Sequence, residues 1–575
     1  MVDGVPLNDP FGGWVAWYKV PRLSLAGAEI ARGGGSGAWG NAALGGTLSL
    51  FSEDFNQPGG LGVVTGGEFG TWLGEAATTQ RITSRSAFRL DAAAFRTEGF
   101  YTVLPSQRGA IDRRLDSDYQ RLQISWEQRL SENTTAVITG RTFSEERGNG
   151  TPLQQNGTRE NFLSTTLSGR TELLPAWSWV SYVQRQHFNS FFSSVDATRA
   201  TETPANDQFD VPSSAAGTAF TAQWLHANRA TTTAGADARW VKGETREAFS
   251  YLNGRFTRQR RAGGEQSFAG LFATHDRPLF KGWFSSLALR LDHWENAQGH
   301  RRETDLITSS SVRDERYVRD RGVELSPRLG ITGPLGFSGL RGRAAVYQAF
   351  RIPTLNEYYR PFRVGNVNTE ANPALKRETV DGLEVGFDYR ISTATVSITG
   401  FVNDLNDAVA NVTLSRTPTL VSRQRRNLDS VRVRGIESTV TWAARPTLTL
   451  RADYLYHESE VRRASEQPGL VGLKLAQVPR HTLTAGATWT LPPRWTFDAR
   501  VRTVASQFED DENTLSLSAY TAIDLQLAYR FNRTLEFFLS AENTTDEKIE
   551  TGRTTDGLVS IDGPRRIRGG IKLAW

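Results

Sequence analysis

The sequence contains no cysteine and only one methionine. A disulfide framework and a thiolate metal site are therefore excluded. Seven histidines are scattered over 575 residues, and none has the HExxH spacing of a zinc hydrolase. No spacing singles out a catalytic His–Ser pair. We therefore expect no catalytic centre, no resident metal and no cofactor.

Long apolar runs are absent as well. No stretch approaches the roughly 20 apolar residues of a membrane-spanning helix, and the mean hydropathy is −0.43. The chain is nevertheless rich in tryptophan, phenylalanine and tyrosine (15, 30 and 14 residues). Its 67 basic residues nearly balance 62 acidic ones, which favours a solvated surface over a nucleic-acid partner.

Apolar and polar residues alternate along much of the chain. The clearest cases are the segments HTLTAGATWTL, TAIDLQLAYRF and the final RRIRGGIKLAW. A period of two is typical of a strand with one apolar face, whereas a helix has a period of 3.6. The connections between such segments are alternately short and long. Short ones lie near Asn133, Pro175, Asn228, Lys281, Pro446, Pro493 and Asn532; long polar ones are expected at 99–117, 146–159, 189–216, 295–321, 351–376, 461–474 and 545–564.

This pattern predicts an all-β fold, a transmembrane antiparallel β-barrel of about 22 strands. Outer-membrane barrels have short periplasmic turns and long extracellular loops. A propeller or a β-helix would show repeats of fixed period, which we do not find. Barrels of this width have a plugged lumen, and the glycine-rich start lacks strict alternation. We therefore expect residues 1–57 to lie inside a barrel formed by residues 58–575.

The N-terminal stretches VDGVPLNDP and EIARGGGSGAWGNAALGGTLSL resemble the last part of the plug domain of TonB-dependent outer-membrane receptors. The segments FRIPTLNEYY to FDY (350–389), VRVRGIES (431–438) and AENTTDEKI (541–549) resemble later motifs of the same family. The plug positions that match are Asp3, Gly4, Val5, Glu29, Ile30, Arg32, Gly33, Ser36, Trp39, Gly40, Gly45 and Gly46.

The resemblance implies a receptor in a Gram-negative outer membrane, surrounded by lipid and lipopolysaccharide. It implies uptake of a scarce chelate, for which we expect a ferric siderophore, with energy supplied by TonB. Cobalamin or an oligosaccharide is the alternative cargo. Because Met1 falls inside the plug pattern, we expect the TonB-contacting segment and the first part of the plug to be missing through a mis-assigned start or a fragmented gene. A naturally shortened receptor, acting as a passive barrel, is the alternative.

The resemblance also implies that Arg32 of the plug pairs with Glu384 and Glu437 on the barrel wall; the alternative is that both glutamates simply face water in the lumen. In the loop RIPTLNEYYRPFR, aromatic and guanidinium groups are interleaved, which suits a planar anionic ligand; a solvated loop, or one facing lipopolysaccharide phosphates, is the alternative. The ligand-binding candidates in that loop are Arg351, Tyr358, Tyr359, Arg360, Phe362 and Arg363.

Two further motifs have weaker implications. The acidic stretch Glu509, Asp510 and Asp511 could hold a calcium ion through its oxygens, or it could be an exposed loop tip. The segment Asn372–Leu375 is similar to the box of haem receptors, but no histidine lies between Phe350 and Lys376. Haem is therefore not the expected ligand.

Overall fold

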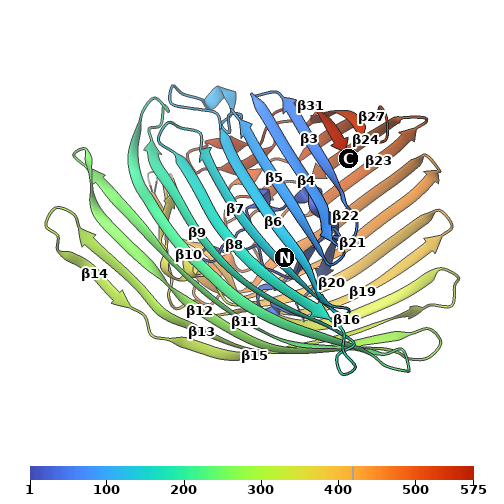
Figure 1. The fold of residues 1–575 in the computed structure, drawn as a ribbon. Coiled ribbons are helices and arrows are strands. Elements are labelled where there is room, and N and C mark those ends of the chain that lie inside the picture. The colour runs from blue at the N-terminus through green and yellow to red at the C-terminus, as the bar shows by residue number, and fades with distance from the viewer. Residues whose placement is uncertain (36, 365, 418–419) are drawn as a thin grey trace.

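The computed structural model describes residues 1–35, 37–364, 366–417 and 420–575. Within these ranges, 22 strands form a closed antiparallel barrel (Figure 1), which confirms the predicted fold class and strand number. No helix in the described ranges is long and apolar enough to cross a membrane. The wall strands are β3 (Gly59–Gly67), β4 (Thr71–Thr83), β5 (Ser86–Thr97), β6 (Ser117–Ser131), β7 (Thr134–Gly148), β8 (Gln155–Gly169), β9 (Ala176–Val195), β10 (Glu202–Leu225), β11 (Thr231–Leu252), β12 (Arg255–Pro278), β13 (Phe284–Asp305), β15 (Asp320–Pro334), β16 (Leu340–Arg351), β19 (Glu378–Ile391), β20 (Ala394–Arg416), β21 (Val421–Arg445), β22 (Leu448–Arg463), β23 (His481–Leu491), β24 (Trp495–Val504), β27 (Tyr520–Arg530), β28 (Leu535–Glu542) and β31 (Arg566–Ala574).

The barrel is closed by its first and last strands, β3 and β31, which pair from Leu61 opposite Ala574 to Gly67 opposite Arg568 (Figure 1). Next to this paired stretch, Gly60 and Trp575 exchange two backbone hydrogen bonds, of 2.8 and 3.0 Å. Closure leaves the wall without an unpaired edge that could recruit another strand.

Alternation along β13 separates the two faces of the wall. Leu287, Leu289 and Leu291 are about half exposed and point outward. Between them, Arg290 and Asp292 are fully buried, and Arg290 donates to the backbone oxygen of Gly37 at 2.9 Å. Since Gly37 belongs to the N-terminal segment, the polar face of the wall is the one that faces the lumen.

Three stretches expected to be long loops are largely strand. The segments 146–159, 189–216 and 295–321 lie mostly in β7 to β10 and β13 to β15. Strands β9 to β13 have 20–24 residues each, about twice the 9–11 that a tilted strand needs to cross a membrane. Polar residues stand on both faces of their outer halves, and those on the inner face, such as Gln208 and Glu247, are buried against other parts of the protein. These halves therefore lack the apolar alternation that would reveal a strand.

The wider connections contain short elements of their own. They are η4 (Pro105–Gln107), β14 (Ser311–Arg316), α1 (Leu355–Tyr359), β17 (Phe362–Val364), β18 (Val367–Glu370), η5 (Pro468–Leu470), β25 (Gln507–Phe508), β26 (Ser516–Leu517), β29 (Glu550–Arg553) and β30 (Val559–Ile561).

The N-terminal segment lies inside the barrel (Figure 1). Its strands β1 (Leu25–Arg32) and β2 (Gly46–Ser52) form a separate antiparallel sheet, next to the 3₁₀ turns η1 (Trp17–Lys19), η2 (Arg22–Ser24) and η3 (Gly40–Ala42). The first wall strand, β3, begins at Gly59. Ser36, one of the motif positions, lies outside the described residues.

Candidate ligand-binding site

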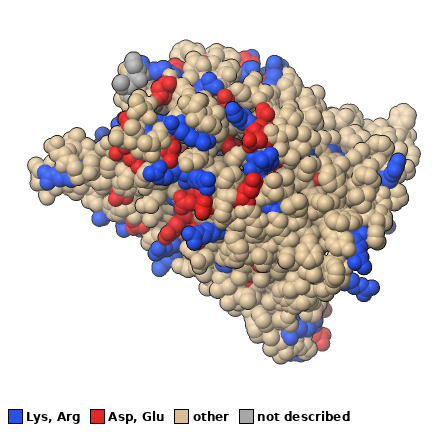
Figure 2. Space-filling model, turned by 90° about the horizontal axis from the view of Figure 1, so that it is seen from above, with Lys and Arg blue, Asp and Glu red and all other residues tan. Residues whose placement is uncertain are grey.

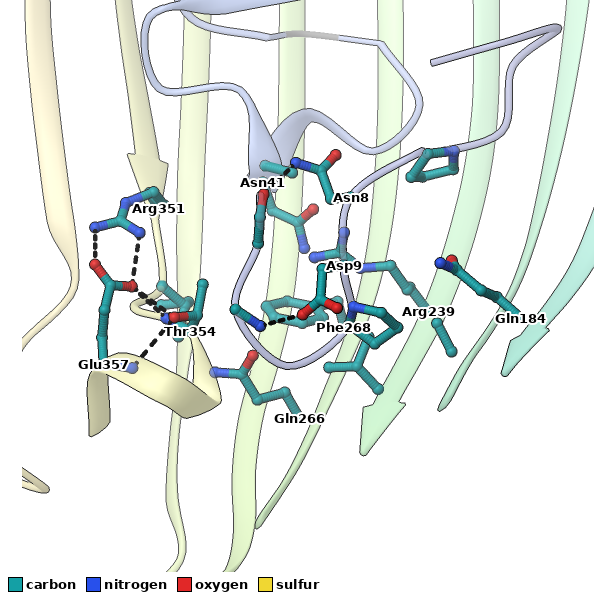
Figure 3. A pocket seen from close by; sticks show the side chains of 18 of the residues that line it. Asn8, Asp9, Asn41, Gln184, Arg239, Gln266, Phe268, Arg351, Thr354 and Glu357 are labelled. Atoms are coloured by element: carbon teal, nitrogen blue, oxygen red, sulfur yellow. Dashed lines mark hydrogen bonds and ion pairs between the residues drawn. The ribbon is translucent and has the colours of Figure 1, made fainter. Parts of the chain in front are cut away.

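A cavity of about 280 Å³ lies between the N-terminal segment and the lumenal face of the wall (Figure 3). Most residues of the stretch 6–13, together with Asn41 and Ala42, line it from the N-terminal segment, and residues of β9, β10, β11 and β12 line it from the wall. The connection after β16 contributes Arg351, Ile352, Thr354 and Glu357. Three parts of the chain that are distant in sequence therefore meet at one space inside the lumen.

Asp9 shapes the turn of residues 8–13 beside the cavity. Its carboxylate accepts hydrogen bonds from the backbone N–H groups of Phe11 (2.9 Å) and Gly12 and from the side chain of Gln186. Asn8 closes the turn by donating to the oxygen of Gly13 at 2.8 Å. Burial raises the pKa of Asp9 to about 6, although its hydrogen bonds and the nearby Lys19 oppose that shift.

Arg351 lines the cavity, but its guanidinium is held by acids of the protein. It donates to both oxygens of Glu357, at 2.9 and 3.1 Å, and also contacts Glu378. Glu357 and Thr354 form a capping box that starts α1, so the sequence Thr-Leu-Asn-Glu dictates this turn. Burial opposes ionisation of Glu357, but the bonds from Arg351 and Thr354 hold its pKa below the usual range.

Most other candidates in this loop face into the protein. Tyr358 and Tyr359 are buried, with Tyr359 stacked on Tyr317 at 5.4 Å between ring centroids. Arg360 is ion-paired with Glu247. Phe362 lies under the guanidinium of Arg425, and Arg363 is exposed. Of the six loop residues that the sequence suggested, the structure places Arg351 alone on the cavity.

Arg239 on β11 is a cavity residue that the sequence reasoning missed. Its guanidinium carbon lies 4.6 Å from the centroid of the Phe268 ring on β12, and both residues line the cavity. The alternation of residues along β11 could have indicated that Arg239 faces the lumen, because it shares a face with Asp237 and Val241. Alternation gives the face, but it does not show which level of a long strand lies beside the N-terminal segment.

The pairing expected between Arg32 and two glutamates takes a different form. Arg32 is ion-paired with Glu437, whereas Glu384 accepts a hydrogen bond from the hydroxyl of Tyr347 at 3.2 Å. These four residues line a second cavity of about 600 Å³. The ion pair is open to water, with 58% of the Arg32 side chain and 27% of Glu437 exposed, so we expect it to contribute little.

A buried ion pair joins the N-terminal segment to the wall more firmly. Lys19 contacts Glu160 on β8, and both side chains are almost completely buried. Glu160 also accepts from Arg141 at 3.0 Å and from Gln184 at 2.7 Å. Buried charges of this kind must be paired, because removing one partner leaves the other charge buried and uncompensated.

The N-terminal motif residues have local structural roles. The Asp3 carboxylate accepts two bonds from Ser52 at the end of β2, at 2.8 and 2.6 Å. Gly33 has a φ of +78°, and a Cβ there would come within 2.8 Å of the Tyr347 ring, so another residue would be both strained and crowded. The remaining motif glycines, at turns or beside the wall, are Gly4, Gly40, Gly45 and Gly46.

The carboxylates of the acidic stretch at 509–511 accept hydrogen bonds from other groups of the protein. Asp510 accepts from the Leu515 amide at 2.8 Å and from Arg416 at 3.2 Å. Asp511 accepts from the amide and hydroxyl of Thr413. In the part of the chain that the structure describes, no group of three or more histidine, aspartate or glutamate residues could hold a metal ion.

Charges of both signs are interspersed on the face shown in Figure 2. That face does not carry a broad field of one sign that would steer a charged ligand. We therefore expect discrimination among ligands to depend on the residues that line the cavity.

A family model described as "TonB dependent receptor-like, beta-barrel" matches residues 99–543. The chain belongs to this family. It is accordingly a TonB-dependent receptor of the Gram-negative outer membrane. The family is one of transport receptors rather than enzymes.

Two curated relatives are similar over part of this TonB-dependent receptor. An iron-regulated outer membrane virulence protein of Vibrio cholerae is 24% identical over 282 residues, which are 45% of this chain and 41% of that protein. The vitamin B12 transporter BtuB of Photobacterium profundum is 22% identical over 231 residues, 40% of this chain and 35% of that protein. The matches thus span less than half the length of these relatives.

Solved structures share the fold over nearly the whole receptor. The copper transporter OprC superposes with a TM-score of 0.80 at 15% identity, covering 100% of this chain and 92% of that one. The ferric yersiniabactin uptake receptor FyuA of Yersinia pestis gives a TM-score of 0.77 at 12% identity, covering 95% and 85%. At such low identity the likeness establishes the fold alone.

Proposed function

We propose that this receptor imports a ferric siderophore across the outer membrane. The observation that carries the proposal is the cavity between the N-terminal segment and the wall, where the Arg239 guanidinium lies over the Phe268 ring. A cation and an aromatic face together suit a flat ligand with acidic oxygens. The names of FyuA and of the iron-regulated relative support the same class of cargo.

In this proposal residues 1–57 act as plug and residues 58–575 as barrel. A ligand in the cavity touches both parts, so its binding can be sensed by the plug. TonB is the proposed source of energy. Lys19 and Glu160 then anchor the plug to the wall, while Arg351 orders the loop beside the cavity by binding Glu357.

Other cargoes have less support from the residues present. Soft sulfur ligands select copper(I), but the chain has no cysteine and one methionine. A chelated metal needs no such ligands, because the chelator supplies them. Cobalamin, named for the BtuB relative, and an oligosaccharide are the competing cargoes for the binding test.

The test compares ligands on one protein. The purified chain in detergent is titrated with ferric catecholate, ferric hydroxamate and ferric phenolate siderophores, with cyanocobalamin and with a maltodextrin series. In parallel, the source bacterium with and without the gene is grown under iron limitation on each chelate. We expect submicromolar binding of at least one ferric siderophore and loss of growth on that chelate. Tight binding of cobalamin or a glycan alone would overturn the proposal.

A further inference from the structure

The cavity contains hydrogen-bonding groups that the protein itself does not satisfy. Asn41, in η3 of the N-terminal segment, is only 3% exposed, yet neither its Oδ1 nor its Nδ2 has a partner among the described residues. Native proteins satisfy the large majority of buried polar side chains. Figure 3 shows Asn41 and Arg239 bordering the same space, one from each side.

Arg239 is in a similar position on the wall. No hydrogen bond or ion pair to its guanidinium is found among the described residues, and its Nε is buried without an acceptor. The nearest acids are already engaged, because Arg290 binds Asp237 at 2.6 and 3.1 Å and Asp292 at 2.8 and 2.5 Å. The Phe268 ring supports the guanidinium from one side, which leaves its N–H edge for an acceptor.

These two side chains offer complementary chemistry. A guanidinium presents donors only, in a planar fork that matches a carboxylate or a pair of adjacent oxygens. A primary amide presents one acceptor and two donors, so it can bind a hydroxyl and its neighbouring oxygen together. The neutral amides of Gln184 and Gln266 extend the same polar lining.

The size of the cavity limits what can enter. About 280 Å³ lies just below the 300–1,000 Å³ of typical small-molecule sites. The space therefore suits one aromatic arm of a chelate rather than the whole complex, whose bulk would remain above it.

We infer that Asn41 and Arg239 form a two-sided recognition pair for an aromatic arm that bears a carboxylate or adjacent oxygens, with Arg239 on the acidic group and Asn41 on the hydroxyl. This inference rests on the proposed function for the identity of the complete ligand, but the pair itself can be tested without iron. An arm held in this way bridges the N-terminal segment to β11, so specificity and contact with the plug depend on the same two residues.

The test uses iron-free 2,3-dihydroxybenzoate and benzoate as probes, titrated by ligand-observed NMR against the detergent-solubilised 575-residue chain. We expect Arg239→Gln to weaken binding of both probes at least tenfold, with partial recovery in Arg239→Lys, which keeps the charge but loses the fork. Asn41→Ala should weaken dihydroxybenzoate several-fold and leave benzoate unchanged, because benzoate has no hydroxyl to bind.

Arg500→Gln on β24 is the matched control, since it removes the same charge from the wall away from the cavity. Heat-modifiable gel mobility verifies that each variant folds. Failure of the wild-type chain to bind either probe, or equal binding by all variants, would overturn the recognition pair even if a ferric siderophore is imported. Probe binding with the expected pattern, in a chain that binds no ferric siderophore, would instead retain the pair and overturn the proposed cargo.

Discussion

Arg360, in the connection between β16 and β19, donates from Nε to Glu247 on β11 at 2.5 Å, and the Glu247 side chain has no exposure to solvent. The same carboxylate accepts from Arg260 on β12 at 3.1 Å. A residue that the sequence suggested as a ligand contact thus ties the loop to a distant part of the wall. Its substitution tests loop stability as well as ligand binding.

Arg360→Ala should loosen the connection of residues 352–377. Removing one partner of a buried ion pair costs about 3–5 kcal/mol, and the remaining Arg260 should keep the loss nearer 1–3 kcal/mol. Hydrogen exchange of this loop, compared between variant and wild type, measures the change. Arg159→Ala is the control, because its pair with Glu146 is 3.8 Å long and almost fully exposed. Equal protection in all three proteins would contradict the prediction.

Leu525→Arg should impair barrel assembly far more than Gln526→Arg. Leu525 is the central residue of β27, and its cross-strand partners Ala499 and Ala541 share its outward face. Arginine on the lipid side at mid-membrane costs roughly 2–4 kcal/mol, whereas the lumen tolerates charge. The yield of heat-modifiable barrel in lipid vesicles measures the difference. Similar yields from both variants would show that the faces are wrongly assigned.

Lys19→Met should release the N-terminal segment more readily than Arg32→Met. The Lys19 side chain is 2% exposed beside a fully buried Glu160, whereas the pair between Arg32 and Glu437 is open to water. Loss of a buried partner costs several kcal/mol, and an exposed pair contributes at most about 1 kcal/mol. Protease accessibility of residues 1–57 within the intact barrel gives the comparison. A larger effect from Arg32→Met would reverse our ranking of the two contacts.

Docking of the N-terminal segment should weaken as the pH rises from about 4 to about 6. Burial raises the pKa of Asp9 to about 6 from its usual 3.8, so the docked state retains a proton that the released state gives up. The extra stability of the docked state is fully present below the usual pKa of 3.8 and is lost as the pH rises through about 6. The free energy of docking changes by roughly 2–3 kcal/mol over this range. Lys19 and Glu160 are the charged groups that also act on this carboxyl.

Asp9→Asn should abolish that pH dependence. The amide keeps an acceptor for the Phe11 and Gly12 amides but does not titrate between pH 4 and 6. Hydrogen exchange of residues 1–20 at pH 4, 5, 6 and 7, corrected for intrinsic exchange, follows the docking. A wild-type profile that is flat over this range, or one unchanged in Asp9→Asn, would count against the assigned pKa.

The sequence by itself determined the architecture of this protein. The alternation in segments such as His481–Leu491 fixes a strand with two different faces, and the short turns fix antiparallel order. Both signals are local, because a wall strand has an apolar face toward lipid and a more polar face toward the lumen. The same logic failed in the outer halves of β9 and β10, where polar residues stand on both faces, and strand residues there were expected to be loop.

Only the tertiary structure decided the site. Arg351 and Arg360 are of a residue type that often binds anionic ligands. In the structure, however, both are bound by acidic residues that lie 6 to 113 residues away in the sequence. Arg239 has no distinguishing sequence context, and it becomes a binding candidate because Arg290 already holds the neighbouring carboxylates. Which charge remains available depends on all partners within a few ångströms, and the folding of distant segments brings those partners together.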